Sequence, residues 1–372
     1  LIDVGRDQAR EFLNRLKDRA GLLWKRDLKM STFIPVFRVR RDSLVVASGN
    51  QGSRTSVYGL NARDGSILWE QRTGGHVALS QIMADGSVIG ISQEDPDKTV
   101  AAWRLNMENG QRIWTRAIAS PVKGAAYWFS EPLLLCDRAY MAVNRWKGRE
   151  TVSQYLCLDL DGNVLWQQSE STALSPLADA GYRNLGAGTD ALVVGWKDTL
   201  RAYNLDSGKV LWTETLPSSS VPDFVTDGNL LFFRTMDHQA NAFDIATCRL
   251  LWRCPLPDAR RSLPKSRIYS EAANCLGDNR MLTWDNEKLY MLSVTKGATR
   301  EAPIWTYPLP KPLVTPPRIK DGAVYALLSD NTLLALDAGS GKERLRRSLL
   351  WKAQNFDVAG DVVFLLSEDS DL

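Results

Sequence analysis

The chain has 372 residues, of which 44% are hydrophobic and 24% are charged, and its formal net charge at pH 7 is +3. This balance supports a large buried core, and the small net charge gives no electrostatic case for nucleic-acid binding. No run of about 18 apolar residues occurs, so we expect no transmembrane helix.

Residues 1–20 are predicted to form a lead-in helix or linker. A helix over residues 7–20 would carry one apolar stripe, made of Ala9, Phe12, Leu13, Leu16 and Ala20. This helix either packs against the domain that follows or links it to a preceding domain or a partner. Because Leu1 is not an initiator methionine, we expect the chain to be a cut domain or a processed product.

A short phrase recurs along the rest of the chain. It consists of apolar residues, Asp or Asn, a turn with Gly, and a Trp four residues after that Gly, as in Leu-Asn-Ala-Arg-Asp-Gly-Ser-Ile-Leu-Trp at 60–69. Intervals of 45, 45, 52, 46, 40 and 53 residues separate the tryptophans of the series, which are Trp24, Trp69, Trp114, Trp166, Trp212, Trp252 and Trp305. A further 40 residues lead to Leu345, which holds the Trp position. A period of this size indicates a repeat architecture.

Each repeat is predicted to contain about four β-strands. The β-prone runs 87–91 and 230–233 follow the turn pairs Asp85-Gly86 and Asp227-Gly228, which supply the positive φ that tight hairpins need. A more amphipathic strand comes next, and the Gly turn then leads to a last strand that carries the Trp. About four strands per period with no helix between them is typical of a β-propeller blade, and the intervals leave no room for the helical crossovers of a parallel α/β fold.

The phrase resembles the repeat of quinoprotein-type β-propellers, often called PQQ-like repeats, and its closest match is Leu334-Ala335-Leu336-Asp337-Ala338-Gly339-Ser340-Gly341-Lys342. The resemblance covers nearly the whole chain from about residue 21, and it implies an all-β fold with a single β-propeller over residues 21–372. At the level of the fold, the chain is also similar to the propeller assembly factors of the bacterial outer-membrane β-barrel machinery. Two repeats depart from the pattern: Cys248 replaces Gly before Trp252, and eight residues separate Gly297 from Trp305. We expect altered turns there.

The two ends of the chain decide the predicted number of blades. Residues 21–28 read as a final strand with nothing before it to complete a blade, and residues 349–372 read as the first two strands of one. We therefore expect eight four-stranded blades, the last of them shared by the N- and C-terminal strands, because such closure removes free sheet edges. A seven-bladed ring with loose ends is the alternative.

The recurrent tryptophan is predicted to be structural. A large aromatic side chain on an outer strand would fill the wedge between neighbouring blades and bury roughly 150–250 Å². A role in stacking on a cofactor would need one particular Trp in the central channel, and the repeats single out none.

No catalytic constellation is indicated. Quinoprotein dehydrogenases share the fold that the chain resembles, and they resemble one another in an adjacent Cys-Cys pair and in Glu, Asn and Asp ligands for calcium; no Cys-Cys dipeptide occurs here. His76 and His238 lie in different repeats and supply no clustered metal ligands. The run 159–163 resembles a calcium loop only superficially, and a hairpin turn explains it better. We expect no enzymatic activity, no cofactor and no metal site.

Binding surfaces are the more promising candidates. The third repeat has a long hairpin with Arg145, Trp146, Lys147 and Arg149 at its tip, a mixture that protein interfaces favour. We predict partner binding by these four residues, with a plain solvated hairpin as the alternative. Two further basic stretches could bind an acidic partner if they lie on the same rim of the ring. They are Arg260, Arg261, Lys265 and Arg267 in the first, and Arg344, Arg346, Arg347 and Lys352 in the second.

The leading functional hypothesis is a non-catalytic propeller scaffold that binds another protein, or another domain of a larger bacterial protein, because a rigid ring holds many loops in fixed relation. The alternatives are a ligand-sensing propeller and a quinone-dependent dehydrogenase. The five cysteines are scattered and odd in number, which favours the cytoplasm over the periplasm without deciding between them. One bridge among Cys248, Cys254 and Cys275 stays open.

Overall fold

The strand content of the chain follows the predicted period. The computed structural model describes residues 36–40, 43–47, 55–73, 77–80, 82–94, 99–120, 122–148, 150–173, 184–196, 199–216, 224–234, 239–255, 273–277, 280–284, 287–293, 303–349, 352–359 and 362–367. All regular secondary structure in these ranges is β-strand, which confirms the all-β prediction. In the same ranges, no helix has the length and hydropathy that crossing a bilayer requires.

Three sheets lie in one compact unit of the chain, Leu22–Leu185 with Arg201–Leu211. The first contains β1 (Val36–Arg40), β2 (Ser43–Ala47), β3 (Thr55–Asn61) and β4 (Ile67–Thr73). The second contains β5 (Val77–Leu79), β6 (Ser87–Glu94), β7 (Thr99–Asn106) and β8 (Arg112–Ala119). The third contains β9 (Ala126–Phe129), β10 (Leu133–Leu135), β11 (Arg138–Lys147), β12 (Glu150–Asp159) and β13 (Val164–Ala173).

The following sheet contains β14 (Asn184–Ala187), β15 (Ala191–Trp196), β16 (Thr199–Asn204) and β17 (Val210–Thr215). The other compact unit consists of Leu1–Gly21, Gly186–Leu200 and Trp212–Leu372. One of its sheets contains β18 (Phe224–Asp227), β19 (Leu230–Arg234), β20 (Gln239–Asp244) and β21 (Arg249–Pro255). The next contains β22 (Ala273–Gly277), β23 (Arg280–Trp284), β24 (Lys288–Ser293) and β25 (Trp305–Pro308). A further sheet contains β26 (Arg318–Lys320), β27 (Ala323–Leu327), β28 (Thr332–Asp337) and β29 (Glu343–Ser348). The strands β30 (Ala353–Ala359) and β31 (Val362–Ser367) form a two-stranded sheet.

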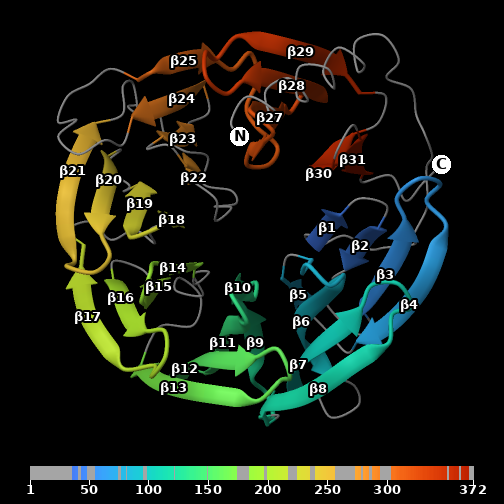
Figure 1. The fold of residues 1–372 in the computed structure, drawn as a ribbon, viewed down its shortest axis with the longest axis vertical. Coiled ribbons are helices and arrows are strands. Elements are labelled where there is room, and N and C mark those ends of the chain that lie inside the picture. Colours follow the sequence, from blue (N-terminus) through green and yellow to red (C-terminus); the bar gives the residue numbers. More distant parts are fainter. Residues whose placement is uncertain are drawn as a thin grey trace. The chain divides into compact units, whose positions relative to one another are not determined.

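Every four-stranded sheet is an antiparallel meander, and Figure 1 shows its strands following one another in chain order, as from β1 to β4 and from β26 to β29. A register shift recurs between the third and fourth strands, for example at Gly59/Leu60 and at Ala335/Leu336. This repetition confirms the predicted repeat of about four strands. The strand over residues 21–28 and the lead-in helix lie outside the described residues. The shared eighth blade therefore stays a prediction, of which the pair β30–β31 supplies two strands.

The apolar core lies between successive sheets. In the first unit, Val57 of β3 and Trp69 of β4 pack with Leu79 and Trp103 of the second sheet. In the other unit, the last two sheets are joined by a cluster that includes Tyr325 and Phe356. Inner strands that are buried on both faces, such as β7 and β28, read as nearly continuous apolar runs.

Five of the recurrent tryptophans join their own sheet to the next by a hydrogen bond. The indole Nε1 of Trp69 donates a hydrogen bond to the backbone oxygen of Met107 at 2.8 Å, and Trp305 donates to Ala338 at 3.0 Å. The same contact at 2.7 Å is made by Trp114 to Leu160, Trp166 to Leu205 and Trp212 to Ile245. Each acceptor is the residue directly after the third strand of the following sheet. These tryptophans have the structural role that the repeat predicts.

The glycine of the phrase makes room for the tryptophan of the preceding sheet. Gly208 has a φ of +67°, and a Cβ atom built on it would lie 2.7 Å from Cδ2 of Trp166. Gly110 has a φ of +69°, and its Cβ would lie 2.5 Å from Cδ2 of Trp69. The left-handed turn and the close approach of an indole both require a residue without a side chain. The Gly–Trp phrase is therefore required both by the turn itself and by the contact of these glycines with the tryptophan of the preceding sheet.

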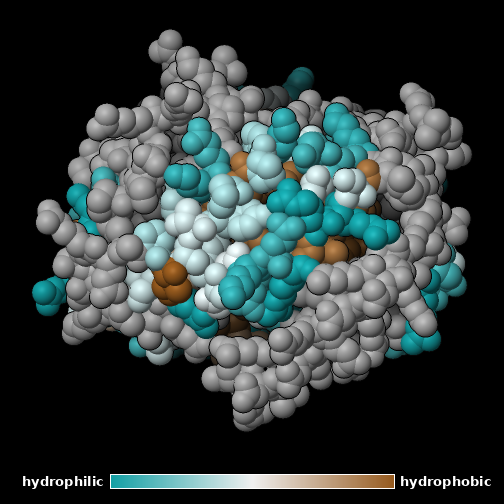
Figure 2. Space-filling model, turned by 90° about the horizontal axis from the view of Figure 1, so that it is seen from above, coloured by the Kyte–Doolittle hydropathy of each residue, from teal (hydrophilic) through white to brown (hydrophobic). Residues whose placement is uncertain are grey.

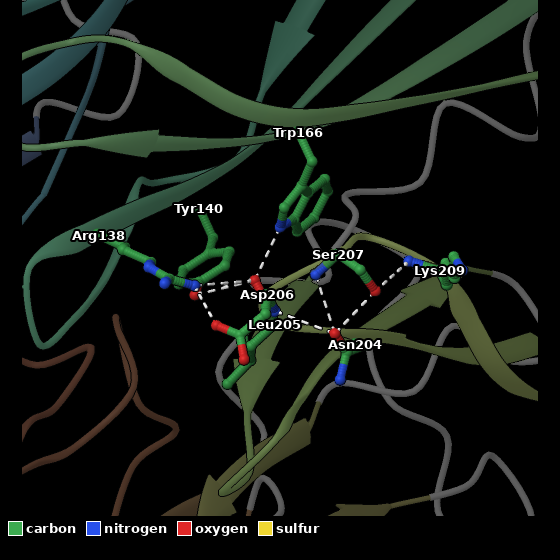
Figure 3. Close-up of polar contacts among 8 residues, drawn as sticks. All are labelled: Arg138, Tyr140, Trp166, Asn204, Leu205, Asp206, Ser207 and Lys209. Atoms are coloured by element: carbon green, nitrogen blue, oxygen red, sulfur yellow. Dashed lines mark hydrogen bonds and ion pairs between the residues drawn. The ribbon is translucent and has the colours of Figure 1, made fainter.

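Figure 3 shows one such junction in full, between the third sheet and the turn after β16. Trp166, Tyr140 and Arg138 all reach the backbone oxygen of Leu205, at 2.7, 3.4 and 3.4 Å. Arg138 also pairs with Asp206 at 2.5 Å, but the Asp206 side chain is 79% exposed, so this ion pair contributes no more than about 1 kcal/mol. The buried indole is the main stabilising group of the junction.

The turn that contains Cys248 is not altered, contrary to expectation. Cys248 adopts a φ of +53°, the left-handed conformation that glycine takes in the other repeats. Asp244 Oδ1 accepts a hydrogen bond from the Thr247 amide at 2.8 Å, and the register shift of the repeat is kept at Ala242/Phe243. A short side chain tolerates this conformation at a cost of roughly 1–2 kcal/mol. The second expected change, near Gly297, lies outside the described residues.

The thiol of Cys248 is free, so Cys248 takes no part in the bridge that the sequence left open. Burial raises the pKa of Cys248 to about 11, and the charge of Glu214 adds to the rise. The side chains of Cys254 and Cys275 lie outside the described residues. Cys136 and Cys157 are free thiols as well.

Candidate protein-interaction site

The predicted hairpin is formed by two long strands, β11 and β12, of ten residues each. They pair along their full length, from Arg138↔Asp159 to Lys147↔Glu150 at the tip. The outer part of β11 also pairs with β9, in the register Val143↔Phe129 to Trp146↔Ala126, while the inner part pairs with β10. The strands that lead to the tip are therefore part of a five-stranded sheet.

Strand geometry separates the four residues predicted to bind a partner. Successive side chains of a β-strand point to opposite faces of the sheet. Arg145 and Lys147 consequently share one face, and Trp146 lies on the other. Arg149 lies outside the described residues. The predicted mixture of basic and aromatic side chains is therefore not gathered on a single surface.

Trp146 has an aromatic neighbour that the sequence analysis missed. The rings of Trp128 and Trp146 are stacked, with centroids 6.4 Å apart and an angle of 20° between their planes. Trp128 lies on β9 directly opposite Asn144, and both tryptophans are half-buried. Trp128 is not one of the tryptophans that close a repeat, but Trp103, Trp196 and Trp284 are not either, so no sequence pattern distinguished it. We call this pair the tryptophan face.

The sheet around the tryptophan face is firmly held on both sides. Beside it, Ser153 Oγ donates a hydrogen bond at 2.8 Å to Oδ1 of Asn144, and the two residues are 1% and 9% exposed. On the opposite side of the sheet, Tyr127, Phe129 and Val143 belong to the apolar core shared with the preceding sheet. A satisfied polar pair and a packed core fix the backbone of β9 and β11. The tryptophan face is consequently a pre-organised surface.

The charges at the hairpin tip partly compensate one another. Lys147 and Glu150 are exposed and directly opposite in the β11–β12 register, where opposite charges attract. Arg145 is half-buried and lies opposite the apolar Val152. Strong selection for an acidic partner is therefore not a property of the described part of this hairpin.

The basic stretch at residues 344–352 is mostly paired within the chain. Arg344 forms an ion pair with Asp337, and Arg346 pairs with Glu343 at 2.9 Å and with Tyr307 Oη at 2.8 Å. The hydrogen bond from Arg346 holds the pKa of Glu343 below its usual value, although burial opposes it. Figure 2 shows the face over β25 and β29, where hydrophilic residues gather around smaller apolar patches. The other basic stretch, at residues 260–267, lies outside the described residues.

Of the metal-site candidates in the sequence, the run 159–163 lies within the described ranges. No cluster of three or more His, Cys, Asp and Glu side chains suited to a metal ion occurs there. His76 and His238 lie outside these ranges. Asp159 Oδ1 accepts hydrogen bonds from the amides of Asp161 and Asn163, at 3.0 and 2.7 Å. The run 159–163 is thus a hairpin turn stabilised by its own aspartate, as the sequence indicated.

Two curated relatives match parts of the chain. The outer membrane protein assembly factor BamB of Yersinia pestis is 23% identical over 200 residues, which cover 50% of this chain and 47% of the relative. The tetrathionate hydrolase of Acidithiobacillus ferrooxidans is 23% identical over 244 residues, which cover 60% of this chain and 46% of the relative. The chain spans about half the length of the curated relatives it matches.

Solved structures show the same fold over most of the chain. The crystal structure of BamB from Moraxella catarrhalis has a TM-score of 0.59 at 12% identity, with 89% of this chain and 93% of that chain covered. A europium-containing methanol dehydrogenase has a TM-score of 0.56 at 14% identity, with 85% of this chain and 77% of that chain covered. Identity this low shows the fold alone, and it confirms the predicted PQQ-like β-propeller.

Membership of a family follows from a third comparison. The family model described as outer membrane protein assembly factor BamB matches residues 15–149, 148–302 and 297–364, which together are nearly the whole chain. The Trp-to-carbonyl junctions, the repeated register shift and this match agree, and the chain belongs to the family of the outer membrane protein assembly factor BamB.

Proposed function

We propose that this chain is a non-catalytic β-propeller scaffold that binds a protein partner through the tryptophan face of the β9–β11–β12 sheet. The observation that carries the proposal is the stacked and half-buried Trp128–Trp146 pair, in which Trp146 lies on the ten-residue strand β11. Trp is among the residues most enriched at interface hot spots. Its rigid side chain loses little conformational entropy on binding.

The rigidity of the sheet supports the same function. Binding is weakened by every side chain and loop that must be ordered when the partner arrives. The Asn144–Ser153 pair and the core contacts of Phe129 have already fixed the strands that carry the two indoles. A partner would therefore meet a surface that changes little on association.

The family suggests what kind of partner this is. The matching family model and one of the two curated relatives are named as an outer membrane protein assembly factor. By that likeness, we propose that the partner is another component of the assembly of outer membrane proteins. The scaffold acts by holding that component in place, without chemistry of its own.

A capture experiment tests the tryptophan face. Wild type, Trp146→Ala and the Trp128→Ala/Trp146→Ala double variant are immobilised, and proteins retained from a detergent extract of the source cells are quantified by mass spectrometry. Loss of a hot-spot Trp costs about 2 kcal/mol or more, which corresponds to a roughly thirtyfold weaker affinity. We expect one or more envelope proteins to be retained by wild type and lost from both variants.

Lys209→Ala is the matched control, because Lys209 is an exposed residue on a turn of a different sheet. It should retain the same proteins as wild type. Circular dichroism and a melting curve check that the variants are folded. An identical set of retained proteins from wild type and the folded double variant would contradict the proposed binding face.

A titration with a quinone cofactor distinguishes the scaffold from the enzyme alternative. The tetrathionate hydrolase and the methanol dehydrogenase show that this fold also serves catalysis. If this chain is a scaffold, pyrroloquinoline quinone with calcium ions should leave its melting temperature unchanged, because a ligand stabilises a protein only by binding its folded state. Differential scanning calorimetry checks this. A rise in melting temperature that grows with quinone concentration would instead support the dehydrogenase alternative.

A further inference from the structure

Strand β13 is the outermost strand of its sheet. It pairs with β12 from Glu150↔Ala173 to Leu158↔Val164, and the sheet order ends with it. Along one edge, its backbone N–H and C=O groups therefore have no strand partner within the described residues. Such an edge is a template for pairing with another strand unless something blocks it.

Most outer strands of this chain carry the residues that block such pairing. Lys, Arg and Pro at an edge discourage another strand from adding to it. The protected outer strands and their blocking residues are β4 with Arg72, β8 with Arg112 and Arg116, β21 with Arg249, Arg253 and Pro255, β25 with Pro308, and β29 with Arg344, Arg346 and Arg347. Only β13 and β17 lack all three residue types among the outer strands of the described four- and five-stranded sheets.

Of these two, β13 offers the better template. It has ten residues, whereas β17 has six and follows directly after Lys209. On β13 the exposed side chains alternate with more buried ones: Gln167, Ser169 and Ser171 are exposed, and Gln168 and Glu170 are half-buried. The exposed side chains are small or uncharged, so nothing on that face repels an approaching strand.

The one charge on β13 is already compensated. Oε1 of Glu170 accepts short hydrogen bonds from Arg201 and from the hydroxyl of Tyr203, both on β16. The side chain of Glu170 is 25% exposed. The carboxylate is therefore directed at its own chain, and it does not act as a free negative charge at the edge.

We propose that β13 pairs in antiparallel fashion with β13 of a second copy of this chain, with the twofold axis at Ser169. In that register Ser169 faces Ser169, Gln167 faces Ser171 and Gln168 faces Glu170. No like charges lie opposite one another, and the Gln168 amide can donate to Oε2 of Glu170 in the other copy, while Oε1 keeps its contacts with Arg201 and Tyr203. The strand is thus complementary to itself, which a twofold interface requires, and the main-chain hydrogen bonds of the added strand supply the affinity.

Sedimentation equilibrium over a range of protein concentrations tests the proposal. We expect wild type to reach twice the 41.6 kDa of the single chain as its concentration rises. Ser169→Lys would place two ammonium groups directly opposite each other, where like charges destabilise a strand pair. We expect it to weaken dimerisation at least about tenfold. The matched control is Thr215→Lys on β17, at another exposed outer-strand position, and it should dimerise like wild type.

Three results would overturn the proposal: a single-chain mass for wild type at every concentration, a dimer that a folded Ser169→Lys variant forms equally well, or a dimer that Thr215→Lys disrupts to the same degree. Should Ser169→Lys fail to fold, Ser169→Cys gives an independent reading. Under mild oxidation it should form a covalent dimer on a non-reducing gel, because directly opposite residues of an antiparallel pair lie about 4.5–5.5 Å apart. Wild type contains every native cysteine and is the control; an equal amount of covalent dimer in both would also count against the interface.

Discussion

Replacing Trp166 with alanine is expected to lower the free energy of unfolding by about 3–5 kcal/mol. The indole of Trp166 is 7% exposed, lies between two sheets and donates a hydrogen bond to the Leu205 backbone oxygen. The substitution removes the buried aromatic surface, leaves a cavity against Gly208 and removes the shortest of the three hydrogen bonds to the Leu205 backbone oxygen. The loss is measured by urea denaturation, with unfolding monitored by far-ultraviolet circular dichroism because this signal does not depend on tryptophan fluorescence.

Leu165→Ala is the matched control for this prediction. Leu165 precedes Trp166 on the same strand, but its side chain is 45% exposed. It should therefore cost less than about 1 kcal/mol, because little apolar surface returns to water. A loss below about 1 kcal/mol for Trp166→Ala itself would mean that the indole does not join the two sheets.

Gly208→Ala is expected to destabilise the protein by about 2–5 kcal/mol, through two separate effects. The φ of +67° at Gly208 strains any residue with a Cβ atom, at roughly 1–2 kcal/mol. The new methyl group would also lie 2.7 Å from the Trp166 ring, and overpacking of this kind costs typically 1–3 kcal/mol. The free energy of unfolding in urea measures the sum of the two effects.

Gly86→Ala separates the two effects. Gly86 has a φ of +79°, but a Cβ atom there would meet nothing within 4 Å. It should show the backbone strain alone, at roughly 1–2 kcal/mol. Equal losses for Gly86→Ala and Gly208→Ala would show that the Trp166 ring moves aside without cost, and that the glycine serves only the turn.

The spacing of the repeat made the fold predictable. Asp-Gly pairs and the Gly turn specify hairpins through local backbone sterics, and Gly86, Gly228 and Gly322 all take the positive φ that these turns need. Local sterics also explain the one error among the turns. Cys248 is small enough to adopt the left-handed conformation, so the loss of glycine did not alter the hairpin.

The candidate site was predictable only in part. Trp146 was found because it lies on an unusually long hairpin, and strand alternation alone could have separated it from Arg145 and Lys147. Trp128 was missed because its contact with Trp146 depends on the pairing of β9 with β11. That pairing joins residues 14 to 20 positions apart across an intervening strand, β10, and no local pattern signals it.

The sequence by itself determined the all-β class, the repeat of about four strands and the structural role of the recurrent tryptophan, because hairpin turns and strand periodicity are local properties of the chain. Only the tertiary structure decided which groups meet. It showed that five of the recurrent indoles bind the carbonyl after the third strand of the next sheet, that Trp128 stacks on Trp146, and that β13 ends its sheet without a blocking residue. Such contacts depend on how distant segments pack, and packing is a property of the folded chain as a whole.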